Sequence, residues 1–442
     1  MLRPWVSFLI LLFLVPARAE TWDANDFQEL VNQIESSIRS MNRLEGENSC
    51  RTPATDDAKK RKDPKPVLPG GIPICEKNRA PLFSEDSILD LEIEADLNQV
   101  PGPAQFQDRE TNLKRSHPAK IRFQDSNGAK KEIQIGLLRR SKSRFYSCDF
   151  KPLKLVFPED LNLENTIFDR LKADEMKLVV HCGYTSGKIE ENPKKFNEDI
   201  KEEYAVYKFL KALGYPVPEV RLVKVNYKKP GGEFVVEGLG ILIEPKGSLG
   251  KRCACGHAKG KGLWDPIIPA DTDPTIYAGL LFAERIAASG DWIAKIGHNV
   301  IPLTCDEKVV GLAPYDFNDS ALVSARGATY NHLLQSGARF FRMISRGPFD
   351  RDDRPTVDLN DREKWAWNKA IRSEAARLIV VKSRLYAALD QADIQNKEHI
   401  REHFDNFYAH LEKWLAQEIG IRNVARSVQD KAKELKQLES GN

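Results

Sequence analysis

The sequence predicts an α+β fold with two lobes, a strand-rich N-terminal lobe and a helical C-terminal lobe. Between residues 84 and 245 short apolar runs recur with a period close to two, which is typical of strands. After Pro245 the apolar residues recur at helical spacing instead, most clearly from Ile394 onwards. Hydrophobic residues make up 41% of the chain, enough to build a sizeable core. We therefore assign residues 84–245 to the strand-rich lobe and residues 246–442 to the helical lobe.

The N-terminus is typical of an exported protein. Residues 1–19 combine Arg3, a short apolar run and an A-x-A cleavage motif at Ala17-Arg18-Ala19, as in a secretory signal peptide. The apolar run is too short to span a bilayer comfortably, and no other stretch approaches about 18 apolar residues. We expect a periplasmic or secreted protein with no transmembrane anchor after signal cleavage.

Residues 20–83 are expected to form an N-terminal helix followed by a Cys- and Pro-rich linker. Apolar residues at helical spacing from Asp26 to Leu44 predict the helix. The stretch from Asn48 to Ala80 contains a basic run, several prolines, among them Pro64, Pro66 and Pro69, and a Gly-Gly pair, which indicate an irregular segment. Its sequence does not decide whether it docks a partner or only tethers the lobes.

Charge and cysteine content limit the partners and the compartment. The net charge is +3 with 30% charged residues, so we expect no nucleic-acid partner. Seven cysteines in an exported chain predict disulfides with at least one cysteine left over, and Cys50 with Cys75 and Cys148 with Cys182 are candidate pairs. The Cys253–His257 cluster lacks the second cysteine pair of a tetrahedral zinc site, which favours a disulfide or free thiol over a metal there.

Individual elements follow from local patterns. Alternating apolar residues predict strands near Ile88–Ala95, Lys120–Phe123, Glu132–Ile135, Lys154–Phe157, Met176–Val180, Val220–Asn226 and Phe234–Glu244. Asp125-Ser126-Asn127-Gly128 predicts a hairpin turn between the second and third of these strands. Helical periodicity predicts helices over Phe196–Leu213, Pro274–Ala288, Trp365–Asp390 and from Ile394 towards the C-terminus.

Three polar residues in the second half of the chain have the order that a phosphoryl-transfer site requires. Asp291 follows Ser289-Gly290 at the end of a predicted helix, Asn299 follows His298, and Asp316 opens an Asp-Phe-Asn turn. One carboxylate can orient a nucleophilic hydroxyl, while an amide and a second carboxylate can hold Mg²⁺ or Mn²⁺. We therefore predict Asp291 as the catalytic residue and Asn299 and Asp316 as metal ligands. The structural alternative is a helix cap, a turn and a surface loop.

A nucleotide site also needs cations for its phosphates. Lys177 on a predicted strand, followed by Glu203 on the next helix, matches the lysine and glutamate ion pair of kinases, and Lys154 competes with Lys177 for this role. Arg139 opens a basic turn that also contains Arg140, Lys142 and Arg144 and could cover phosphates, although such a run can equally be a solvated face.

These motifs together resemble the secreted CotH-type kinases, which are named from spore-coat proteins. The segments that carry the resemblance are Ile135–Ser141, Lys151–Leu155, Gly290-Asp291-Trp292, His298-Asn299 and Pro314–Asn318. The resemblance implies an atypical protein-kinase-like fold with Mg-ATP as donor and a protein Ser or Thr hydroxyl as acceptor. It also places Asp291 in the catalytic position, Asn299 and Asp316 in the metal positions, and Lys177 with Glu203 in the ion pair.

Two other classes of function stay open. The first is a catalytically inactive kinase-like binding protein of the cell envelope, because the chain has no G-x-G-x-x-G loop and eight positions separate Asp291 from Asn299. The second is a metal-assisted hydrolase that uses Asp291 and His298. It ranks last, since neither G-x-S-x-G nor H-E-x-x-H occurs.

Overall fold

The structure is a computed structural model of the 442-residue chain. It describes residues 79–102, 114–125, 128–140, 152–169, 171, 175–180, 184–185, 188–189, 193–252, 256–257, 272–289, 292, 298–305, 308–323, 337–348 and 359–419. Several predictions lie outside these residues: the signal peptide, the helix over Asp26–Leu44, both candidate disulfides, Cys253 with Cys255, Lys142 with Arg144, and Asp291.

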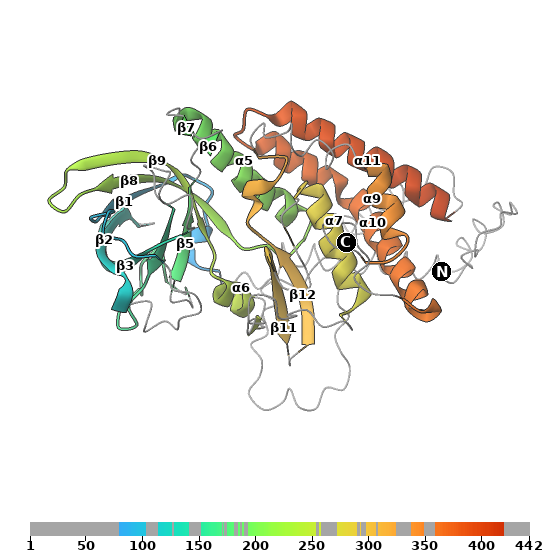
Figure 1. The fold of residues 1–442 in the computed structure, drawn as a ribbon, viewed down its shortest axis with the longest axis horizontal. Coiled ribbons are helices and arrows are strands. Elements are labelled where there is room, and N and C mark those ends of the chain that lie inside the picture. The colour runs from blue at the N-terminus through green and yellow to red at the C-terminus, as the bar shows by residue number, and fades with distance from the viewer. Residues whose placement is uncertain are drawn as a thin grey trace, which may run out of the picture.

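The first half of the described chain is strand-rich, and seven of its strands close into a barrel (Figure 1). The strands are β1 (Leu89–Glu94), β2 (His117–Gln124), β3 (Lys130–Arg139), β4 (Leu153–Val156), β5 (Glu175–Val179), β8 (Val220–Lys228) and β9 (Phe234–Ile243), in the order β1-β2-β3-β4-β5-β9-β8. Neighbouring strands are antiparallel except β1 and β8, whose parallel pairing closes the barrel. A separate two-stranded ribbon joins β6 (Tyr184–Thr185) to β7 (Lys188–Ile189).

The strand pattern of the sequence corresponds to the two faces of this barrel. Leu91, Ile121, Leu155 and Leu178 belong to one buried cluster that fills the interior. The predicted hairpin between β2 and β3 is confirmed: the Asp125 carboxylate accepts a hydrogen bond from the backbone N–H of Ala129 at 3.0 Å. Gly128 has φ 79°, which glycine adopts without steric cost.

One long helix packs on the outside of the barrel. Helix α5 (Pro193–Ala212) follows the small ribbon in the sequence and contacts β8, β9 and the later helix α10. Its buried residues share a core with outward-facing residues of the barrel such as Val179 and Ile243 and with helical residues such as Phe282. Figure 1 shows α5 between the barrel and the other helices. The barrel and the helical region are therefore joined by a continuous hydrophobic core.

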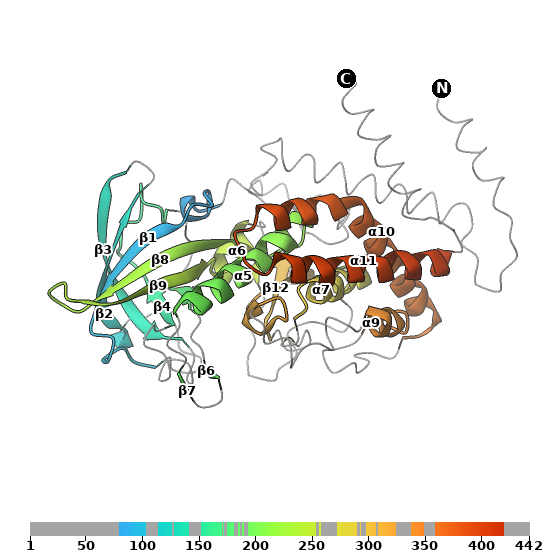
Figure 2. The same cartoon turned by 90° about the horizontal axis from the view of Figure 1, so that it is seen from above.

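The second half of the described chain is mainly helical. Its helices are α6 (Lys246–Arg252), α7 (Pro274–Ile286), α9 (Gly337–Ile344), α10 (Asp361–Gln391) and α11 (Lys397–Ile419). Asp273 caps α7, and Asn360 with Glu363 forms a capping box on α10, which satisfies backbone N–H groups at the helix start. Figure 2 shows α10 and α11 side by side, and the two helices are in contact.

A small sheet lies within this helical half. It consists of β10 (Gly256–His257), β11 (Val300–Cys305) and β12 (Lys308–Pro314), with a short 3-10 helix η5 (Phe317–Asp319) after it, and another 3-10 helix, η3 (Pro81–Phe83), precedes the barrel. The sequence pattern predicts only an apolar stretch and a turn between the two polar motifs, whereas the structure forms an antiparallel hairpin there. The hairpin contacts α7 through β12.

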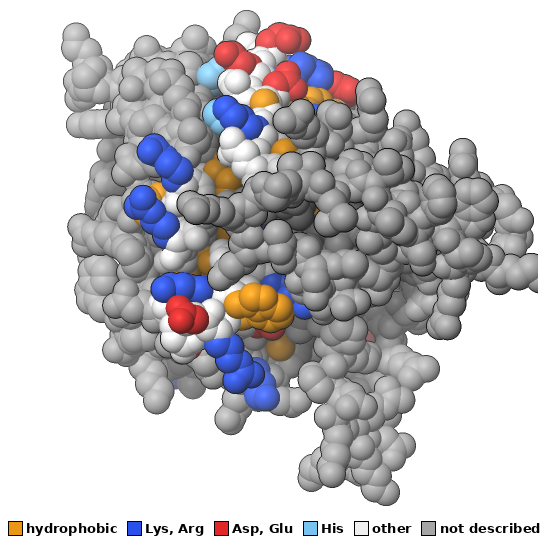
Figure 3. Space-filling view, turned by 90° about the vertical axis from the view of Figure 1, so that its right-hand side faces the viewer, with side chains coloured by type: hydrophobic (Ala, Val, Ile, Leu, Met, Phe, Trp, Pro, Cys, Tyr) orange, Lys and Arg blue, Asp and Glu red, His pale blue; other side chains and the backbone are white. Residues whose placement is uncertain are grey.

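The helical end of the molecule has a mixed surface. Figure 3 views it from the right-hand side of Figure 1, and the described hydrophobic side chains on that face form small separate areas between basic ones. Among the described residues, no helix has both the length and the apolar character needed to cross a membrane.

Candidate functional site

The two predicted metal ligands lie at the open end of the β11–β12 hairpin, where its first strand begins and its second strand ends. Asn299 immediately precedes β11, and Asp316 comes two residues after β12. Val300 pairs with Pro314, and the backbone N–H of Tyr315 donates to the Asn299 carbonyl oxygen at 3.0 Å. The hairpin therefore brings Asn299 and Asp316 to neighbouring positions, although they are 17 positions apart in the sequence.

The backbone is strained around this pair. Asn299 has φ 52° and Asp316 has φ 67°, in the left-handed region that L-residues rarely occupy, although Asn and Asp tolerate it best. Ala288, with φ 47°, is a third such residue, and its carbonyl oxygen accepts from the N–H of Ala321 at 3.0 Å. Clusters of such conformations are typical of functional sites.

Asp316 is held from two sides by residues of the strand-rich half. One carboxylate oxygen lies 2.8 Å from the Nη2 atom of Arg140, which follows β3. The backbone N–H of Asp316 donates to the hydroxyl oxygen of Tyr207 on α5 at 2.9 Å, and the Tyr207 ring packs edge-on against Phe317. The site is therefore assembled across the junction of the barrel and the helical half.

Arg140 lies among acidic groups. Burial opposes its charge, but the carboxylates of Asp316 and Glu203 outweigh burial and raise the pKa of Arg140. Glu203 is fully buried on α5. The basic turn of the sequence thus supplies a site residue, and that residue is Arg140.

Lys177 also faces this site. In the strand register, Lys177 is opposite Lys154 and Lys154 is opposite Leu138, so all three side chains lie on the outer face of the barrel. The Lys177 ammonium lies 4.5 Å from the centre of the Tyr315 ring. Among the described residues, however, Lys177 forms no ion pair with Glu203.

Burial and neighbouring charges change the ionisation of this lysine and tyrosine. Burial lowers the pKa of Lys177 and the nearby cation of Arg140 lowers it further, while Tyr315 and Asp316 only partly offset these effects. Burial alone would raise the pKa of the Tyr315 phenol, but the cations Lys177 and Lys246 lower it. Several positive charges are therefore crowded around Tyr315 and Asp316.

The other two predicted phosphate-binding residues have different surroundings. Lys154 forms a 2.7 Å ion pair with Glu175 on the neighbouring strand. Arg139 is opposite Leu153 in the register, so it lies on the inner face of the barrel and not on the face of Lys177. Its backbone N–H donates to the Pro101 carbonyl oxygen at 2.9 Å. The structure brings Lys154 to the same face as Lys177 but does not bring Arg139 there.

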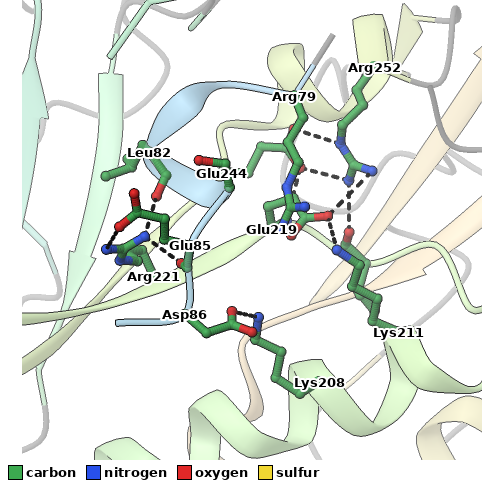
Figure 4. A network of polar contacts seen from close by, with 12 residues as sticks. Arg79, Leu82, Glu85, Asp86, Lys208, Lys211, Glu219, Arg221, Glu244 and Arg252 are labelled. Atoms are coloured by element: carbon green, nitrogen blue, oxygen red, sulfur yellow. Dashed lines mark hydrogen bonds and ion pairs between the residues drawn. The ribbon is translucent and has the colours of Figure 1, made fainter. Parts of the chain in front are cut away.

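A buried network of charges holds the connection between the barrel and the helical half (Figure 4). Glu244 directly follows β9 and forms two hydrogen bonds with Arg252 of α6, at 2.9 and 2.8 Å. Glu219, which precedes β8, forms ion pairs with Lys211 at 2.6 Å and with Arg79 at 3.1 Å. Arg252 is fully buried. The network therefore fixes where α6 begins, and Lys246 is the first residue of α6.

The segment before the barrel extends the same network to α5. Arg221 of β8 donates to the carbonyl oxygen of Leu82 at 3.3 Å and pairs with Glu85 at 3.2 Å. Asp86 forms an ion pair with Lys208 and accepts from the Tyr204 hydroxyl at 3.1 Å. Figure 4 shows Arg221 beside Glu85, and Asp86 beside Lys208 of α5. Residues 79–87 thus tie α5 to the barrel.

Two further observations concern the metal and hydrolase predictions. Among the described residues, no group of three or more His, Cys, Asp or Glu side chains is arranged to hold a metal ion. His298 is exposed at the start of the hairpin. Lys246 and Tyr207 are not predictable as site residues from the sequence, because no local pattern links either residue to Asp316.

Comparison with known proteins adds little to this geometry. No protein-family model matches the chain, and no curated protein matches it. A solved structure of a proinflammatory kinase from Helicobacter pylori, CtkA, is similar over 67% of this chain and 96% of that chain, with 10% identity and a TM-score of 0.29. A TM-score this low does not establish a shared fold, so the function is argued from the site.

Proposed function

We propose that the protein is an exported, atypical kinase-like phosphotransferase that binds a Mg-nucleotide between the barrel and the helical half. The acceptor in this proposal is a protein hydroxyl, as the resemblance to CotH-type kinases implies. The observation that carries the proposal is the convergence of Lys177 and Arg140 from the barrel with Asn299 and Asp316 from the open end of one hairpin.

The order of elements supports a two-lobed, protein-kinase-like arrangement. A strand with a lysine (β5) precedes a helix with a buried glutamate (α5), two strands, a helix (α7) and a hairpin that is followed by an aspartate. Protein kinases use this order of lysine strand, glutamate helix, catalytic loop and metal-binding aspartate. The seven strands close into a barrel, which differs from an open kinase sheet, but the order of the elements along the chain is the same.

The residues fit a nucleotide with a hard divalent cation. The Asp316 carboxylate and the Asn299 amide supply oxygen ligands, which Mg²⁺ and Mn²⁺ prefer. Lys177 and Arg140 would contact the phosphates, and a bound metal ion would neutralise charge that develops on the transferred phosphoryl group. Arg140 pairs with Asp316 in this structure. When a Mg-nucleotide binds, the Arg140 guanidinium would contact a phosphate and the Asp316 carboxylate would bind the metal ion in place of this ion pair.

The catalytic residue in this proposal is Asp291, which is assigned from the sequence. Ser289, two residues before it, pairs with Ser320, and the Ser320 hydroxyl donates to the Ala287 carbonyl oxygen. The chain therefore enters the Asp291 segment next to the segment that follows Asp316. In this proposal the Asp291 carboxylate orients the acceptor hydroxyl and accepts its proton, a role that is typically worth about 10²- to 10⁴-fold in rate.

The first test is a thermal-shift titration of the mature protein with ATP, ADP and AMP-PNP, each with and without Mg²⁺ or Mn²⁺. We expect a metal-dependent rise in stability, about 2.7 kcal/mol at a ligand concentration of 100 Kd. Asp316→Asn should abolish the metal-dependent part, and asparagine suits the left-handed backbone at this position. Glu132→Gln, which removes an exposed ion pair with Arg122, is the matched control and should respond like the wild type.

An inactive binding protein is the second candidate, favoured by two observations. Arg140 occupies the Asp316 carboxylate that a metal ion would need, and Lys177 has no ion pair with Glu203 among the described residues. Phosphate transfer to a mixture of protein substrates separates the two candidates. Nucleotide binding without transfer would favour the inactive protein, and the absence of any nucleotide or metal effect would refute the kinase proposal.

A further inference from the structure

Two lysines from different elements meet at one tyrosine beside Asp316. The ammonium group of Lys177, on β5, lies 4.5 Å from the centre of the Tyr315 ring, and that of Lys246, the first residue of α6, lies 4.8 Å from it. All three side chains are half-buried. The arrangement spans the junction between the barrel and the helical half, because α6 directly follows β9.

Among the described residues, neither lysine has the carboxylate partner that several other half-buried lysines have. Lys154 pairs with Glu175 at 2.7 Å, and Lys211 pairs with Glu219 at 2.6 Å. Among the described residues, Lys177 and Lys246 form no ion pair with a carboxylate. Tyr315 offers them a ring face, which is a weaker partner than a carboxylate.

The surroundings add positive charge. Arg140 is close enough to lower the pKa of Lys177, as burial and Lys246 also do, and the Asp316 carboxylate, on the residue after Tyr315, is already paired with Arg140. Cations that are partly withdrawn from water and repel each other cost free energy unless an anion compensates them. Such a cluster is therefore suited to a ligand with several negative charges.

We propose that Lys246 is a second phosphate-binding lysine and that Lys177 and Lys246 together bind the phosphate chain of the nucleotide, with Tyr315 holding both side chains in place. The identity of the ligand as a nucleotide rests on the proposed function, whereas the polyphosphate site rests on the geometry of these three residues. The Glu244 and Arg252 pair fixes the start of α6 and so keeps Lys246 at this position.

Inorganic tripolyphosphate tests the site without a nucleoside. Its affinity for the full mature protein, measured by isothermal titration calorimetry without divalent metal, should fall about tenfold in Lys246→Ala, since a charge-assisted contact is lost. Lys246→Arg keeps the charge and should retain affinity within about threefold. Lys369→Ala is the matched control, because Lys369 also lies over an aromatic ring, 5.2 Å from Trp365, but far along the sequence on α10; its affinity should be unchanged.

The outcomes separate this inference from the proposed function. Absence of tripolyphosphate binding to the wild type, or equal affinity in Lys246→Ala and the wild type, would overturn the phosphate-binding role of Lys246. If tripolyphosphate binding depends on Lys246 but no nucleotide gives a metal-dependent effect at Asp316, the polyphosphate site stands and the kinase proposal fails. Far-UV circular dichroism of each variant shows whether it is folded, and Lys246→Gln provides a second neutral variant with a polar side chain.

Discussion

Glu219 is a buried carboxylate that stays ionised in the folded protein. Only a small part of its surface is exposed, and it is surrounded by Lys211, Arg79 and Arg252. Burial alone would raise its pKa, but these three cations outweigh burial, so the pKa of Glu219 is lowered from its ordinary value of 4.5. The ionised form is therefore favoured by folding.

We predict a specific pH dependence from this residue. Because the folded-state pKa lies below the unfolded-state value, the stabilisation is fully present above about pH 4.5 and is lost as pH falls through the folded-state pKa. At pH 7, Glu219→Gln should lower the free energy of unfolding by about 1.5–3 kcal/mol, because charge-assisted hydrogen bonds are lost. Urea denaturation from pH 7 to pH 3 should show this difference shrinking below pH 4.5. A difference that stays constant over that range would contradict the prediction.

At the scale of elements, α6 is short and owes its position to buried charge. It contains seven residues, and its last residue, Arg252, is fully buried against Glu244 and Glu219. A buried ion pair is costly to break because the remaining charge has no access to water. The barrel offers a less buried counterpart, in which half-buried Arg122 contacts Glu92, Glu94 and Glu132.

We predict that Arg252 contributes more to the free energy of unfolding than Arg122, although both form several ion pairs. Arg252→Met should lower the free energy of unfolding by about 3–5 kcal/mol, since it leaves buried carboxylates behind. Arg122→Met should cost about 1 kcal/mol or less, because its partners remain hydrated. Chemical denaturation of both variants beside the wild type gives the comparison. Similar losses in the two variants would show that burial does not control the contribution of the α6 network.

At the scale of the whole molecule, the barrel and the helical half share hydrophobic core. Val179 and Ile243 on the outer face of the barrel belong to the same cluster as Phe282 of α7 and Phe404 of α11. The barrel interior, which includes Leu155, is a separate cluster enclosed by the strands. We therefore expect the two halves to unfold together even though each has its own arrangement of elements.

A barrel variant tests this coupling. Leu155→Ala removes a fully buried side chain from the barrel interior and should cost about 2–5 kcal/mol. Residues 84–245 contain no tryptophan, whereas Trp367 and Trp414 are buried in the helical half, so tryptophan fluorescence reports on the helices. The fluorescence and circular dichroism transitions should move together to lower denaturant concentration. An unchanged fluorescence transition would mean that the helical half unfolds independently of the barrel.

Local patterns predicted much of the secondary structure. The predicted helix over Phe196–Leu213 corresponds to α5 at Pro193–Ala212, and the predicted helix over Pro274–Ala288 corresponds to α7 at Pro274–Ile286. These elements were predictable because the periodicity of apolar residues reflects which face of each element is buried. The β11–β12 hairpin was missed, since its apolar run is too short to distinguish strand from turn by periodicity.

The candidate site could be predicted only in part. Asn299 and Asp316 were identified from residue type and order, and the hairpin does bring them to neighbouring positions. The predicted ion pair of Lys177 with Glu203 is not formed among the described residues. Instead, Arg140 pairs with Asp316, and the negative charges of Asp316 and Glu203 both raise the pKa of Arg140. Which of several cations faces the site depends on strand register, and a shift of one residue exchanges the faces of Arg139 and Arg140.

The sequence by itself determined the α+β composition, the positions of most strands and helices, and the polar residues that could carry phosphoryl transfer. These features depend on residue type and on contacts close in sequence. Only the tertiary structure decided that β1 pairs with β8 to close the barrel, that Arg140 reaches Asp316, and that Lys246 meets Lys177 at Tyr315. These contacts join residues far apart in the chain, and their formation depends on register, burial and charge in the folded molecule, which no local pattern encodes.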